Sequence, residues 1–291
     1  MKNPLSLYPD LRIPEQRQDE PGLDSELQPK ADHGDKSYVG AGRLKGRKAL
    51  ITGGDSGIGR AVAVAYAREG ADIAFTYLPV EKTDADEVVK ILSDTGVKVC
   101  AIEADFIDNS FAKDVVTKTI EAIGGLDILV NNAGKQVHVE DIAELDIDQV
   151  SQTFQVNIVA QFALVKAALP HLPEGATIIN TTSIQAYEPS PGLLDYAATK
   201  AAIANFTKGL ALQLASKGIR VNGVAPGPIW TPLQPSYGQP MDKLTSFGSG
   251  GSMGRAGQPA ELAPSYVFLA SGESSYTTGE IIAVTGGQFI S

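Results

Sequence analysis

Tyr196 and Lys200, four residues apart, are the pair in this sequence best suited to acid–base chemistry. On a helix they project from the same face, so the lysine ammonium could lower the pKa of the phenol from its usual value of about 10. Ser183 follows a strand-like run over 176–182 and could present its hydroxyl at the carboxyl end of a sheet. Together these three side chains predict proton transfer to or from an oxygen atom.

A glycine-rich loop strengthens this prediction, because Tyr-x-x-x-Lys alone arises by chance in many helices. The run Thr52-Gly-Gly-Asp-Ser-Gly-Ile-Gly59 lies between a short apolar strand over 48–52 and an amphipathic helix over 58–69. Its glycines let the backbone approach a pyrophosphate, whose charge meets the amino end of the helix. The loop therefore predicts dinucleotide binding, with these candidate contacts: Gly53, Asp55, Ser56, Gly57, Ile58 and Gly59.

With these motifs the chain resembles the short-chain dehydrogenase/reductase family over nearly all of residues 42–291. The amino-terminal extension and the block Ser183-Ile-Gln-Ala-Tyr187 look most like its bacterial general-stress branch, related to aldehyde reductases and glucose/ribitol-type dehydrogenases. The resemblance implies hydride transfer between a nicotinamide and the carbon of an alcohol or carbonyl group.

The resemblance also implies a role for each catalytic side chain. Tyr196 would exchange the proton, and Lys200 would favour the phenolate and bind the nicotinamide ribose. Ser183 would hydrogen-bond the substrate oxygen. Asn157 matches the asparagine that disturbs its own helix and connects the proton relay to solvent.

Further cofactor contacts follow from the same resemblance. Asp105 stands where the family uses an aspartate to bind adenine, and Asn131-Asn-Ala-Gly134 matches the signature at the end of the fourth strand. Ile229 and Thr231 would contact the nicotinamide carboxamide. The remaining candidates are Tyr77, Phe106, Asn132, Ala133, Gly134, Tyr196, Lys200, Pro226 and Gly227.

The choice between NAD and NADP depends on the end of the second strand. An acidic side chain there would bind the ribose 2′-hydroxyl and repel a 2′-phosphate, and this sequence has Tyr77 instead. The missing acid favours NADP, but no arginine or lysine replaces it, and Asp55 would repel a 2′-phosphate. The preference stays open, slightly toward NADP.

The elements that position these residues alternate between strand and helix. Strands are expected near 48–52, 72–77, 97–102, 126–131, 177–182, 219–224 and 280–284. Helices are expected near 58–69, 83–94, 110–123, 146–169, 195–216 and 259–270. Such alternation predicts a single α/β domain over 43–291, a doubly wound Rossmann fold with a seven-stranded parallel sheet covered by helices on both faces.

Residues 1–42 differ from the rest, with five of the seventeen prolines and little apolar periodicity. We interpret them as an extended amino-terminal arm. Their composition favours a solvated tail. The alternative is an arm that lies on its own domain or on another subunit, through Leu5, Leu7, Tyr8 and Leu11.

Composition excludes several classes of protein. The net charge of −10 offers no basic stripe for nucleic acid or an anionic membrane. A single cysteine, Cys100, and the absence of a signal peptide or of an apolar run of about 18 residues predict a cytoplasmic protein. His33, His138 and His171 lack metal-ligand spacing, so no metal is expected. Ser183 lies outside a Gly-x-Ser-x-Gly elbow, which argues against a serine hydrolase.

Substrate specificity is expected from Gln185 and Tyr187, beside Ser183 and Tyr196, and from the segment 232–254, which is rich in Gly, Ser and Pro and could act as a lid. This mixture suits a small aldehyde, ketone or polyol. The alternative is a non-catalytic dinucleotide-binding regulatory or scaffold protein, although such proteins usually lack one of the four catalytic residues. By resemblance we expect a homotetramer, with no partner protein implied.

Overall fold

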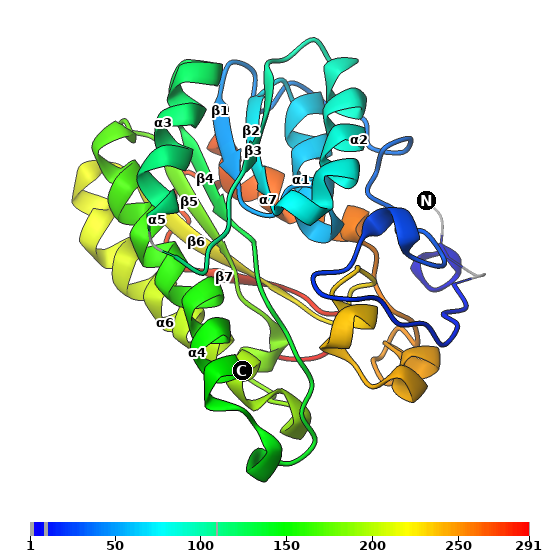
Figure 1. Cartoon of the computed structure of the whole chain (residues 1–291). Coiled ribbons are helices and arrows are strands. Elements are labelled where there is room, and N and C mark those ends of the chain that lie inside the picture. Colours follow the sequence, from blue (N-terminus) through cyan, green and yellow to red (C-terminus); the bar gives the residue numbers. More distant parts are fainter. Residues whose placement is uncertain (1–2, 9–10, 109, 291) are drawn as a thin grey trace.

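The computed structural model describes residues 3–8, 11–108 and 110–290, which form a sheet flanked by helices (Figure 1). All strand pairings are parallel, and the strand order is β3-β2-β1-β4-β5-β6-β7. The strands are β1 (Lys48–Ile51), β2 (Asp72–Tyr77), β3 (Val99–Glu103), β4 (Ile128–Asn131), β5 (Thr177–Thr181), β6 (Arg220–Pro226) and β7 (Ile281–Val284). The predicted doubly wound Rossmann fold is confirmed.

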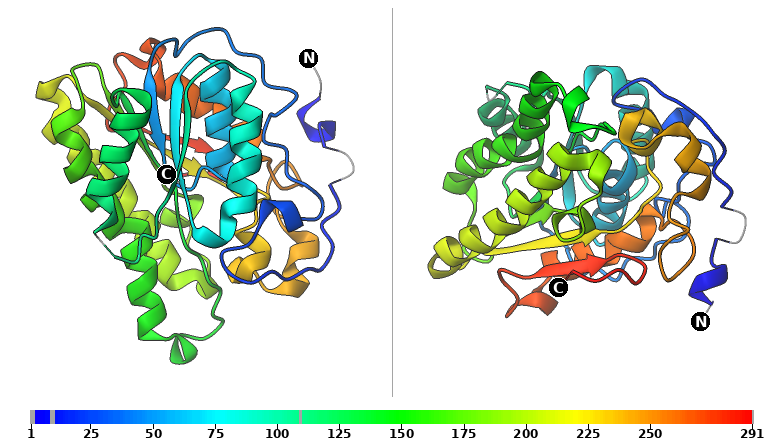
Figure 2. Two further views of the ribbon diagram at one scale, coloured as in Figure 1. Left: turned by 45° about the horizontal axis from the view of Figure 1, so that its top comes forward. Right: turned by 90° about the horizontal axis from the view of Figure 1, so that it is seen from below.

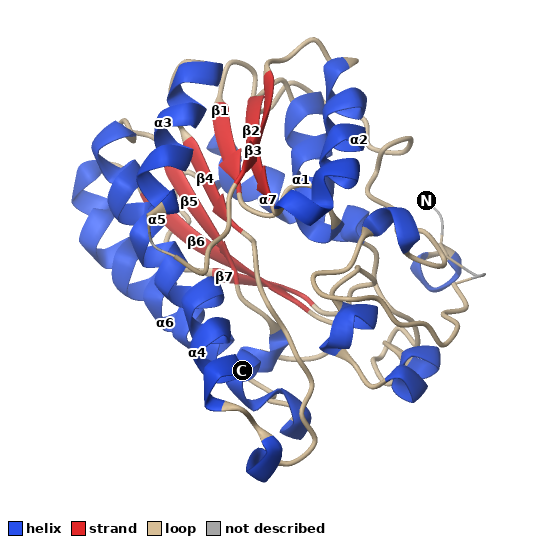
Figure 3. Ribbon diagram, viewed as in Figure 1, coloured by secondary structure: helices blue, strands red, loops and turns tan. Residues whose placement is uncertain are grey.

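Helices cover both faces of this sheet, as Figures 2 and 3 show. They are α1 (Gly57–Arg68), α2 (Lys82–Ser93), α3 (Phe111–Ile123), α4 (Ile147–Phe154), α5 (Ala160–Ala168), α6 (Leu194–Leu214) and α7 (Pro259–Ala270). Alternate residues of β1 point to opposite faces: Ala49 and Ile51 pack with α1, α2 and α7, whereas Leu50 packs with α3, α5 and α6. Two apolar cores therefore hold the sheet between the helical layers.

The strand order reverses between β1 and β4, which lie side by side although β2 and β3 come between them in sequence. In open α/β sheets the crevice at such a switch point, beyond the carboxyl ends of the strands, is where ligands bind. The glycine-rich loop follows β1, and the Asn-Asn-Ala-Gly signature closes β4. The topology therefore places both motifs at one site.

The helix expected over 146–169 is interrupted. Helix α4 ends at Phe154, a π-helical turn covers Gln155–Val159, and α5 resumes at Ala160. Asn157 lies in the middle of this turn and is fully buried. Single π-turns inside helices often occur at functional sites.

The amino-terminal arm does not form a solvated tail, so that interpretation of its composition is wrong for the described part. Ile13 and Leu27 are buried in a small core with Trp230 and Leu244. The indole nitrogen of Trp230 donates a 2.8 Å hydrogen bond to the carbonyl oxygen of Pro29. Figure 1 shows the blue arm lying against the gold segment that contains Leu244.

The residues expected to anchor the arm contribute unequally. Leu11 packs against this small core, and the Tyr8 hydroxyl donates a 2.8 Å hydrogen bond to Asp32. Leu5 is 58% exposed. Within the described residues, no helix is both long and apolar enough to cross a membrane.

Candidate active site

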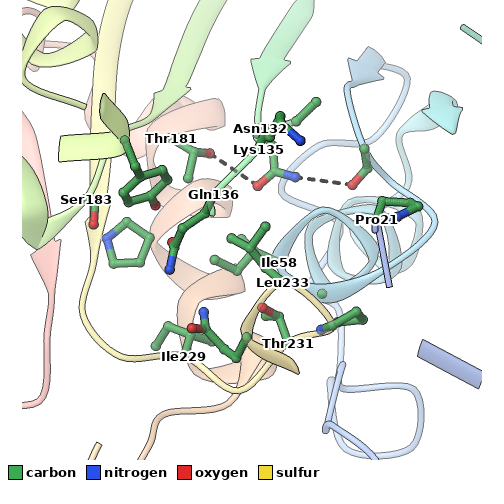
Figure 4. Close-up of a pocket in the computed structure, with 18 of the residues that line it drawn as sticks. Pro21, Ile58, Asn132, Lys135, Gln136, Thr181, Ser183, Ile229, Thr231 and Leu233 are labelled. Carbon is green, nitrogen blue, oxygen red and sulfur yellow. Dashed lines mark hydrogen bonds between the residues drawn. The ribbon is translucent and has the colours of Figure 1, made fainter. Parts of the chain in front are cut away.

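A cavity of about 690 Å³ opens beyond the carboxyl ends of the strands (Figure 4). Loops that follow β1, β2, β3, β4, β5 and β6 contribute to its wall. It brings together most of the residues singled out from the sequence: Gly53, Asp55, Ser56, Gly57, Ile58, Tyr77, Asp105, Phe106, Asn132, Ala133, Gly134, Ser183, Gln185, Tyr196, Lys200, Pro226, Gly227, Ile229 and Thr231.

Three of the proposed residues are not part of the cavity wall. Gly59 and Asn157 lie behind it, and their contacts with wall residues are described below. Tyr187 packs instead against the cluster of Ala204, Ala225 and Ile281, and is not among the described residues that line the cavity. The structure therefore does not support the expected contact between Tyr187 and substrate.

The glycine-rich loop is shaped so that it fits a pyrophosphate group. Gly53 and Gly57 have φ angles of +61° and +49°, a region that side chains disfavour. A Cβ atom on Gly59 would lie 1.8 Å from the carbonyl oxygen of Gly53, so only glycine fits there. Ser56, at the N-cap of α1, makes no side-chain capping bond, which leaves the first amides of this twelve-residue helix free for an anion.

Asn132 braces this loop from the neighbouring strand. Its side-chain nitrogen donates to the carbonyl oxygens of Thr52 and Gly53, at 3.1 and 3.2 Å. Its side-chain oxygen accepts a 3.3 Å hydrogen bond from Thr181, at the end of β5 (Figure 4). The Asn-Asn-Ala-Gly signature thus holds the glycine-rich loop in shape from below the cavity.

Tyr196 and Lys200 are both buried in the cavity wall, on the first turns of α6. The Lys200 ammonium lies 5.3 Å from the centre of the Tyr196 ring and donates a 3.0 Å hydrogen bond to the carbonyl oxygen of Thr181. Ser183 caps the short helical turn after β5 and accepts a 3.1 Å hydrogen bond from the amide of Gln185.

Burial moves both pKa values away from their usual ranges. It raises the pKa of Tyr196 to about 12, and a hydrogen bond with Ser183 opposes this shift only in part. It lowers the pKa of Lys200 to about 8. The expected lowering of the Tyr196 pKa is therefore wrong for this structure, because burial of the phenol dominates the shift.

Asn157 is held by the main chain of Lys135, the residue after the Asn-Asn-Ala-Gly signature. Its side-chain oxygen accepts from the Lys135 amide at 2.6 Å, and its nitrogen donates to the Lys135 carbonyl at 2.9 Å. That nitrogen also donates to the hydroxyl of Thr199 at 3.0 Å, and this hydroxyl donates to the carbonyl oxygen of Tyr196. The π-turn thus connects to the helix that carries the tyrosine.

Gly134 borders a small gap between the side chains of Asn157 and Lys200. A Cβ atom at Gly134 would lie 3.5 Å from the side-chain oxygen of Asn157 and 3.7 Å from the ammonium nitrogen of Lys200. Both polar groups therefore face one small gap. The absence of a side chain there keeps this gap open.

The opposite end of the cavity carries buried acids. Burial raises the pKa of Asp55 well above its usual value, with the Glu81 carboxylate adding to the effect. Burial likewise raises the pKa of Glu81 to about 7. Burial thus favours the uncharged form of Asp55, so its repulsion of a 2′-phosphate is weaker than the sequence indicated.

On the substrate side, Gln185 and Ser190 are hydrogen-bonded to each other. The side-chain nitrogen of Gln185 donates a 2.9 Å hydrogen bond to the Ser190 hydroxyl, and its side-chain oxygen accepts a 2.7 Å hydrogen bond from the main-chain amide of Ser190. The cavity also includes Gln136, which sequence reasoning missed and which Figure 4 shows on the same side as Ser183. Its side-chain nitrogen donates a 2.7 Å hydrogen bond to the carbonyl oxygen of Gly238, which leaves its side-chain oxygen available to a ligand hydroxyl.

Glu20 and Pro21 of the arm also line the cavity and were not predicted to do so. No local pattern in the arm indicates this contact. Gln136 could have been suspected, since it stands two residues after the signature that closes β4.

The comparisons with known proteins agree with this geometry. A family model described as enoyl-(acyl carrier protein) reductase matches residues 53–288. The chain is 57% identical to the uncharacterized oxidoreductase YghA of Escherichia coli, over 100% of this chain and 99% of that protein. It is 50% identical to General stress protein 39 of Bacillus subtilis, over 98% and 99% of the two chains. It is 46% identical to the glucose and ribitol dehydrogenase of Daucus carota, over 95% and 97%.

Solved structures show the same relationship. A short chain dehydrogenase from Burkholderia cenocepacia, crystallised in complex with NADP, has a TM-score of 0.78 and 37% identity, covering 84% of this chain and 98% of that one. The family-model match over 53–288 includes Gly53, Gly57 and Gly59 of the glycine-rich loop and the Tyr196–Lys200 pair. The chain therefore belongs to the short-chain dehydrogenase/reductase family and is an NAD(P)-dependent dehydrogenase or reductase.

Proposed function

We propose that this enzyme interconverts a small alcohol and its carbonyl compound, with Tyr196 as the acid or base. The observation that carries this proposal is the meeting of Ser183, Tyr196 and Lys200 in the same cavity as the glycine-rich loop. A bound dinucleotide would supply or accept the hydride. The loop fits its pyrophosphate, and Lys200 and Thr231 would hold its nicotinamide end.

Each side chain has a distinct task in the proposed reduction. The raised pKa of Tyr196 keeps the phenol protonated at neutral pH, so that it can donate to the forming alkoxide. Ser183 would donate a hydrogen bond to the same oxygen as negative charge develops on it. Lys200 would stabilise the phenolate, and Asn157 would connect the relay to solvent.

We also propose a slight preference for NADP over NAD. Tyr77 ends β2 without an acidic group, and the buried Asp55 favours its uncharged form. The similar short chain dehydrogenase from Burkholderia cenocepacia has been crystallised with NADP, and a blue fluorescent protein of similar structure has been crystallised with NADPH. Measuring kcat/KM with NADH and NADPH tests this preference, and a clear advantage for NADH would contradict it.

For the substrate we propose a small aldehyde, ketone or polyol. The free side-chain oxygen of Gln136 supports a substrate with a hydroxyl group besides the reacting oxygen. The Daucus carota relative is named for glucose and ribitol, and an Arabidopsis thaliana relative is named an NADPH-dependent aldehyde reductase. These names agree with the range that the cavity suggests.

The decisive experiment follows NADH and NADPH oxidation spectroscopically against a panel of aldehydes, ketones and sugars. Tyr196→Phe serves as the control for the assigned acid. Turnover that survives this change would refute the role of Tyr196. Dinucleotide binding without turnover on any substrate would favour the alternative, a regulatory or scaffold protein.

We further propose a homotetramer in the cytoplasm, with the arm over 1–42 and a single catalytic domain over 43–291. The exposed apolar side chains of Phe162 on α5 and Leu212 on α6 support pairing through these helices. The single cysteine, Cys100, suits a reducing compartment. Light scattering on the purified protein gives the mass, and a monomeric mass would contradict the tetramer.

A further inference from the structure

The amino-terminal arm forms part of the wall of the active-site cavity. Glu20 and Pro21 line the cavity beside residues of the glycine-rich loop and of the segment after β6. Figure 4 shows Pro21 at the edge of the pocket, on the side of Ile58 and Thr231. Residues 28 and 27 positions before the first strand thus reach the place where chemistry is proposed.

On one side, the arm lies directly on the segment after β6. The amide of Gln18 donates a 3.2 Å hydrogen bond to the carbonyl oxygen of Pro235. A Cβ atom on Gly22 would lie 2.8 Å from the carbonyl oxygen of Pro232, so the two backbones are in close contact. The position of the arm and the shape of this wall of the cavity are therefore linked.

On the other side, the arm makes an ion pair across the rim of the cavity. The carboxylate of Glu20 pairs with the ammonium of Lys135, whose side chain is 20% exposed. Within the described chain, Glu20 is the acidic residue paired with this lysine. The pairing joins the arm to the loop that follows β4.

Lys135 holds Asn157 at the same time. Its main-chain amide and carbonyl make hydrogen bonds of 2.6 and 2.9 Å to the two ends of the Asn157 side chain. One residue thus binds the arm through its side chain and the π-turn through its main chain. A change in the arm can reach the buried asparagine by this route without contacting it.

We propose that Glu20 is a positioning residue for the reaction, which acts by fixing Lys135 and the arm at the rim of the cavity. Without the ion pair, the Lys135 peptide is less restrained, and Asn157 loses part of its support. The arm is then attached mainly through its contacts with the segment after β6. This inference rests on the proposed function for its catalytic readout.

The expected effect is modest and depends on salt. Glu20→Gln, which keeps the shape and removes the charge, lowers kcat/KM about two- to fivefold at low ionic strength, as expected for a partly exposed ion pair. The loss falls mainly on kcat, because Asn157 serves the proton relay. At about 1 M salt the wild type and the variant converge, since screening weakens the pair in the wild type.

Exchanging the two charges distinguishes the effect of losing the ion pair from the effect of a general loss of structure. Glu20→Lys combined with Lys135→Glu restores most of the activity that either single change removes, because the reversed ion pair again restrains residue 135, whose main chain can make the same hydrogen bonds to Asn157 with either side chain. Glu15→Gln is the matched control: it removes an exposed carboxylate from the same arm and leaves kcat/KM unchanged.

A second readout does not require turnover. Trypsin cleavage after Arg17, which is exposed on the arm, becomes faster in Glu20→Gln and returns toward the wild-type rate in the exchanged pair. Unchanged cleavage together with unchanged kcat/KM in Glu20→Gln overturns the proposal, and so does a double variant no better than the worse single one. A wild type without turnover on any substrate instead overturns the proposed function, and with it the role in the reaction, whereas faster cleavage in Glu20→Gln would still show that the pair fixes the arm.

Discussion

Replacing Lys200 with methionine should make the folded protein more stable at neutral pH while it removes activity. The side chain is 3% exposed, and burial lowers its pKa from 10.5 to about 8. The buried ammonium therefore pays a desolvation penalty that an apolar chain of similar length avoids. Loss of turnover should accompany the gain, because the proposed mechanism needs this ammonium.

The size of the gain follows from the pKa. A fall from 10.5 to about 8 corresponds to about 3 kcal/mol, at about 1.4 kcal/mol for each tenfold change in acidity. The carbonyl oxygen of Thr181 loses a hydrogen bond from Lys200 in the variant, which costs about 1 kcal/mol. A net stabilisation of about 2 kcal/mol is expected at pH 7.

The pH dependence has a definite sign. Below about pH 8 the lysine is charged in both the folded and the unfolded chain, and the full penalty is present. Between about pH 8 and 10.5 the unfolded chain binds more protons, so the stability of the wild type rises with pH. Above that range the penalty is absent, and the advantage of the variant disappears.

Urea unfolding of both proteins at one protein concentration, from pH 7 to pH 10, measures this difference. Lys208→Met is the matched control, since it removes an exposed lysine from the same helix. A variant that is less stable than the wild type at pH 7, or a difference that does not change with pH, would refute the assignment of Lys200 as a buried cation whose desolvation destabilises the fold.

Four other outcomes can be checked. Tyr196→Phe should lower kcat at least about 100-fold with unchanged dinucleotide affinity in a fluorescence titration. Gly59→Ala should abolish that affinity, because its Cβ atom would lie 1.8 Å from the carbonyl oxygen of Gly53. Gln136→Leu should lower kcat/KM about tenfold for a hydroxyaldehyde but not for the aldehyde without the extra hydroxyl. Reduction should slow above about pH 8 as Lys200 loses its proton, whereas the phenol stays protonated to about pH 12; a flat profile to pH 10 would contradict this.

Much of the fold could be predicted from the sequence, because each strand and helix carries its own apolar period. The interruption at Asn157 could not be placed in this way. It depends on hydrogen bonds to the peptide of Lys135, 22 residues earlier, and an isolated asparagine in a helical pattern gives no such signal. Only the family resemblance indicated that this helix would be disturbed.

The site was predictable where its residues follow strands in recognisable motifs, as Gly57 and Ser183 do. The contribution of the arm to the cavity was not predictable, since Glu20 reaches the cavity through contacts between segments that are distant in the sequence. The predicted direction of the Tyr196 pKa shift was wrong for a related reason. The spacing to Lys200 predicts a nearby ammonium, but the extent of burial, which dominates the shift, is a property of the folded chain.

The two perturbed pKa values together give the proposed relay a direction. Once Tyr196 has given its proton to the substrate oxygen, its phenolate is a much stronger base than neutral Lys200. In the proposed relay, the proton held by the ammonium would therefore move toward the phenolate and not away from it. The lysine would then recover a proton from solvent, and we propose that Asn157, which faces the same gap beside Gly134, connects it. The burial that costs stability at Lys200 would thus also make this ammonium acidic enough to resupply the tyrosine in the proposed relay.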